Sequence, residues 1–70
     1  MDAIRTMTTD FVGRLAVAVW IGRLSDEAAC AALDAYAAAC QRIEPAEGSN
    51  LRQVAHAEYR HRREGQDLCS

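Results

Sequence analysis

The chain contains no lysine, one proline and one tryptophan, and its longest uninterrupted apolar run is only seven residues, Leu15 to Ile21. Because a membrane-spanning helix needs about 20 apolar residues in succession, no transmembrane helix is expected. The N-terminus also lacks the basic segment and long apolar stretch of a signal peptide, which favours a cytoplasmic location. No internal repeat or low-complexity tract interrupts the sequence.

Cysteine is scarce and irregularly placed, at Cys30, Cys40 and Cys69. An odd number without regular spacing argues against a disulfide framework, so we expect reduced thiols, with Cys40 as a small core residue. No pair of cysteines has zinc-ligand spacing. His56 and His61 lie five positions apart, about 140° around a helix, and so cannot share one ion. The sequence therefore predicts neither a metal site nor a cofactor.

Catalytic patterns are missing as well. The chain has no glycine-rich phosphate loop, no nucleophile with a nearby base and no paired carboxylates in an apolar setting. A chain of 70 residues is also short for enclosing a ligand pocket of about 300 to 1,000 Å³. We therefore expect that the protein is not an enzyme.

What the chain does have is the composition of a folded protein, 50% apolar and 26% charged residues with a net charge of -2. Residues 1–70 are predicted to form one small helical domain. The core of so short a chain supplies only about 3 to 5 kcal/mol, which makes a partner surface or self-association a reasonable expectation.

The first predicted helix spans residues 2–21. Apolar residues recur at three- and four-residue spacing along it and are expected to form its buried stripe: Ile4, Met7, Phe11, Leu15 and Ala18. A strand over Leu15 to Ile21 is the alternative, because a short run rich in β-branched residues between glycines is ambiguous. Gly22 suits a left-handed helix cap, and Ser25 suits the N-cap of the next helix.

The second predicted helix spans residues 26–43, where eight of the twelve residues from Ala28 to Ala39 are alanine. Three faces are distinguished. The predicted packing seam consists of Ala29, Leu33, Tyr36, Cys40 and Ile43. A neighbouring stripe of small residues consists of Ala28, Ala32, Ala35 and Ala39. Glu27, Asp34 and Gln41 are expected to face solvent. Two adjacent apolar stripes indicate a central helix that contacts more than one neighbour.

A loop over residues 45–50 is predicted to follow, with Pro45 ending the second helix and Ser49 or Asn50 capping the third. The third helix is expected over residues 51–64, with Gly65 as its stop and a frayed tail over residues 65–70. Its apolar side is predicted to consist of Leu51, Val54, Ala55 and Tyr59. The expected fold is thus all-α, a small three-helix bundle made of an αα-hairpin and a third helix.

Basic side chains gather in one quadrant of this third helix: Arg52, His56, Arg60 and Arg63, with Tyr59 at the edge. One interpretation is a partner-binding stripe for an acidic protein surface or, in a dimer, for nucleic acid. The alternative is a solvated face that is favourably placed near the helix C-terminus and includes an ion pair between Glu58 and Arg62. The negative total charge weighs against nucleic-acid binding.

Trp20 lies nearly opposite the predicted buried stripe of the first helix. Tryptophan in an exposed apolar patch is typical of protein interfaces, so Val17, Trp20 and Ile21 are predicted to contact a second chain. Coverage of these residues within the same bundle is the alternative. The expected function is accordingly a non-catalytic protein-protein interaction module, an adaptor or inhibitor such as a virus-encoded inhibitor or antitoxin-like neutraliser, acting on another protein or on itself as a homo-oligomer.

Overall fold

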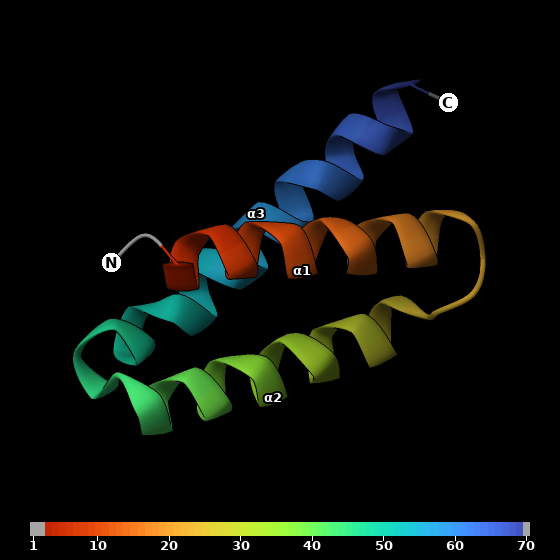
Figure 1. The fold of residues 1–70 in the computed structure, drawn as a ribbon. Helices are drawn as coiled ribbons and strands as arrows, with labels where there is room; N and C mark the ends of the chain where they lie inside the picture. Colours follow the sequence, from red (N-terminus) through yellow and green to blue (C-terminus); the bar gives the residue numbers. More distant parts are fainter. Residues whose placement is uncertain (1–2, 70) are drawn as a thin grey trace.

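The computed structural model describes residues 3–69, except for the side chains of residues 47–49 and 67–69. Within this range the chain forms three helices and no strand: α1 (Ala3–Trp20), α2 (Asp26–Ile43) and α3 (Pro45–Cys69). α1 and α2 run in opposite directions, and α3 crosses both and extends past them at its C-terminal end (Figure 1). The predicted all-α three-helix bundle is confirmed.

α1 is helical through Trp20, so the alternative of a strand over Leu15 to Ile21 is wrong. The buried face of this helix also differs from the predicted stripe and is rotated relative to it around the helix axis. Its buried residues are Thr8, Val12 and Ala16, whereas Met7 is 58% exposed. The remaining predicted stripe residues are half-buried: Ile4, Phe11, Leu15 and Ala18.

Thr8 explains part of this difference between the predicted and the observed buried face of α1. Its hydroxyl donates a hydrogen bond to the Ile4 carbonyl over 2.6 Å and lies 3.0 Å from the Tyr36 hydroxyl of α2. A buried polar group that has partners costs little, so threonine can occupy a core position that the apolar pattern does not assign to it. Beside this contact, the Phe11 and Tyr36 rings stack with centroids 4.7 Å apart.

The turn between α1 and α2 has the geometry expected from its sequence. Gly22 has a φ of 80°, which glycine adopts without strain, and its amide donates to the Val19 carbonyl. The Arg23 amide donates to the Ala18 carbonyl, which completes a Schellman cap. Ser25 then caps α2, its hydroxyl accepting from the Ala28 amide over 3.1 Å. Both predicted caps are confirmed.

α2 has the predicted bounds but buries a somewhat different face. Ala29, Leu33 and Cys40 of the predicted seam are buried, and Tyr36 is half-buried, but Ile43 is 76% exposed. Ala37 joins the buried set. Most of the predicted small-residue stripe faces solvent, since Ala28, Ala35 and Ala39 are exposed and Ala32 is half-buried. α2 packs mainly against α3, which makes α3, rather than α2, the helix that contacts both others most extensively.

The loop predicted over residues 45–50 is helical instead. Only Glu44 separates α2 from α3, and Pro45 is the first residue of α3. Proline ends the preceding helix as expected, but its fixed φ and missing amide also suit the first position of a new helix. Ser49 and Asn50 therefore lie inside α3. Gly65 does not stop α3, and the tail predicted to fray is helical through Cys69, beyond which Ser70 lies outside the described residues.

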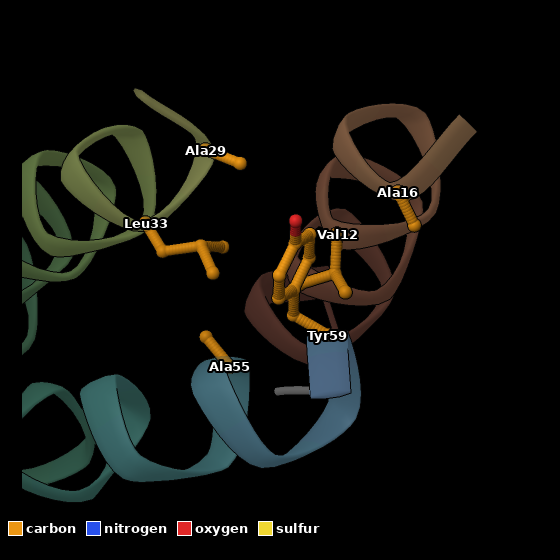
Figure 2. Packing of buried hydrophobic residues seen from close by; sticks show 6 residues of the cluster. All are labelled: Val12, Ala16, Ala29, Leu33, Ala55 and Tyr59. Atoms are coloured by element: carbon orange, nitrogen blue, oxygen red, sulfur yellow. The ribbon is translucent and has the colours of Figure 1, made fainter. Parts of the chain in front are cut away.

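The three helices meet around one apolar cluster (Figure 2). Each helix contributes two residues to it, namely Val12 and Ala16, Ala29 and Leu33, and Ala55 and Tyr59. Leu33 and Val12 are the largest fully buried side chains. Burial of a side chain of this size contributes roughly 1.5 to 3 kcal/mol, and the alanines let the helices approach closely around it. On α3, Leu51 is buried as predicted, but Val54 is 52% exposed.

Candidate protein interaction surface

The basic stripe on α3 faces the acidic residues of α2. The Arg52 Nε lies 2.9 Å from the Asp34 carboxylate, and the His56 Nε2 lies 2.7 Å from the same oxygen. Asp34, predicted to be a solvent residue, is therefore half-buried at the contact between α2 and α3. These two hydrogen bonds hold the pKa of Asp34 below its usual value, with the His56 bond as the larger cause.

A second polar contact joins the same two helices near the start of α2. The Tyr59 hydroxyl donates to the Asp26 carboxylate, and the Arg63 Nε lies 3.6 Å from that carboxylate. The Tyr59 side chain is otherwise buried, and this burial, followed by the hydrogen bond to Asp26 and then the negative charge of Asp26, raises its pKa to about 12. Arg63 also donates to the Gln66 side chain.

Four residues of the predicted stripe are thus engaged with α2. Arg52, His56, Tyr59 and Arg63 all have Asp34 or Asp26 as a neighbour, and only Arg60 is exposed without taking part in these contacts. The positive charge of the stripe is therefore largely balanced by the carboxylates of α2. The predicted pair between Arg62 and Glu58 is present at 3.1 Å.

The predicted apolar residues are exposed on the last turn of α1 and just after it. Val17 is 47% exposed, Trp20 57% and Ile21 55%. Val17 lies on the opposite side of α1 from Thr8 and Val12, since the helical repeat places it about 180° and 140° away from them. The Schellman cap fixes the position of Ile21, whose amide donates to the Val17 carbonyl over 2.9 Å. We call these three residues the α1 apolar patch.

Val17 and Ile21 also line a shallow groove along the outer face of α1 that is widely open to solvent. Its volume is about 890 Å³. Its lining residues are Arg5, Thr6, Thr9, Asp10, Gly13, Arg14, Val17, Ala18, Ile21 and Arg62. All but Arg62 come from α1 or the residue that follows it. Gly13 makes room for the α3 side chain, because a Cβ there would lie 3.3 Å from the Arg62 guanidinium.

The sequence pattern did not predict this groove. Val17 and Ile21 were singled out, but Arg5, Arg14 and the two threonines were not, since they belong to no recognisable motif. One signal was available in Gly13, a glycine in the interior of a helix, which often marks a close approach by another group. The partner in that approach, Arg62 of α3, could not be inferred without knowing how the helices cross.

Cys30 and Cys40 are free thiols, half-buried and buried respectively, so Cys40 is the core residue that was predicted. The Cys69 side chain lies outside the described residues. No group of histidine, cysteine or acidic residues within the described part of the chain has the arrangement of a metal site.

Comparison with known proteins supplies no family for this chain. No family model, no curated protein and no solved structure matches it. Among residues 3–69, none of the helices combines the length and apolar character needed to cross a membrane.

Proposed function

We propose that this protein is a non-catalytic interaction module that binds another protein chain through the α1 apolar patch. The observation that carries the proposal is the exposure of Val17, Trp20 and Ile21 side by side, at 47%, 57% and 55%. Adjacent exposed large apolar side chains are typical of the centre of a protein interface, where tryptophan is enriched.

The architecture supports this use of the patch. The Schellman cap holds the end of α1 in one conformation, so a partner would meet a preformed surface and need not order a flexible segment. The basic stripe is a weaker candidate for the contact because its cations are engaged with Asp26 and Asp34. An adaptor or an inhibitor of another protein would both use such a surface, and binding of a second copy is the simplest version of the same function.

The proposal predicts a separation between stability and association at Trp20. Trp20→Ala should change the free energy of unfolding by no more than about 0.5 kcal/mol, because the side chain is mostly in solvent. The same substitution should abolish any association of the chain. Urea denaturation gives the stability, and light scattering over a concentration series under reducing conditions gives the mass.

The emission of Trp20, the only tryptophan in the chain, adds an independent measurement. It should be that of a solvent-exposed indole in the dilute chain and shift to shorter wavelength when a partner covers the patch. A buried-type emission in a dilute monomer, together with a loss of several kcal/mol in Trp20→Ala, would show that the patch belongs to the core and would refute the proposal.

A further inference from the structure

We draw no further inference here: the strongest candidate, the shallow groove along the outer face of α1, carries none, because Arg14 and Arg62 in its lining are already paired with carboxylates and nothing in the structure shows what covers it.

Discussion

The two contacts that α3 makes differ in kind. Against α2 it combines apolar packing with polar pairs, in which Asp34 and Asp26 accept hydrogen bonds from α3 side chains. Against α1 the buried contact is made by Val12 and Ala16, with Arg62 lying over Gly13 at its edge. The polar pairs fix one register between α2 and α3. They also engage most side chains of the basic stripe with Asp26 and Asp34. α1 is held mainly by apolar contact, and its outer face, with Val17, Trp20 and Ile21, is exposed.

The largest loss of stability is expected at Leu33 of α2, which lies in the core cluster formed by all three helices. Leu33→Ala removes a fully buried side chain and should lower the free energy of unfolding by about 2 to 5 kcal/mol. Because the core is small, most molecules of this variant should then be unfolded, as measured by circular dichroism and urea titration. Val54→Ala, at an exposed position of α3, is the control and should change stability by no more than about 0.5 kcal/mol. A native-like Leu33→Ala protein would mean that the helices do not share one core.

A smaller effect is expected at the polar contact between α2 and α3. Tyr59→Phe removes the hydroxyl that donates to Asp26 and should cost about 1 kcal/mol of stability near neutral pH. Because the folded pKa of Tyr59 is raised to about 12 from 10.0, its contribution is fully present below pH 10.0 and is lost as the pH rises toward 12. The difference between the wild type and Tyr59→Phe should therefore shrink over that interval. Denaturation at a series of alkaline pH values measures it, and a constant difference would contradict the assigned hydrogen bond.

The smallest effect concerns Asp34, whose carboxylate is partly in solvent. Its folded pKa is lowered from 3.8, so its stabilising contribution is present above pH 3.8 and is lost as the pH falls through the lower folded value. Asp34→Asn should be slightly less stable than the wild type at pH 6, and the difference should disappear in acid. Asp10→Asn, which alters an exposed pair within α1, is the matched control and should show little change at either pH.

The parts of the fold that could be predicted from sequence are those determined by local chemistry. The bounds of α2 followed from the Ser25 cap, the alanine-rich interior and Pro45, all of which act within a few residues. Gly22 likewise determined its own turn. The buried face of α1 could not be predicted in the same way, because its last turns are apolar on every side and the actual core face includes Thr8. The Thr8 hydroxyl bonds to the Ile4 carbonyl within the helix, and its second partner, Tyr36, comes from α2.

Tertiary contacts account for the other differences. Pro45 was correctly predicted to end one helix, but that it also begins the next depended on how closely α2 and α3 approach. Asp34 was assigned to solvent because its partners, Arg52 and His56, lie 18 and 22 positions away in the sequence. The residues of the exposed apolar patch were predicted, whereas the groove beside them could not be, because it depends on the placement of Arg62 over α1.

The single residue between α2 and α3 also has a consequence for the order of folding. Glu44 holds the two helices that share the larger interface next to each other, so the entropy lost in closing this connection is small. Such local contacts form early, and the α2 and α3 pair is the expected nucleus onto which α1 docks later. Substitutions between α2 and α3 should then slow folding, whereas substitutions on the buried face of α1 should mainly speed unfolding. α1, which carries the proposed binding surface, would therefore also be the first helix to detach.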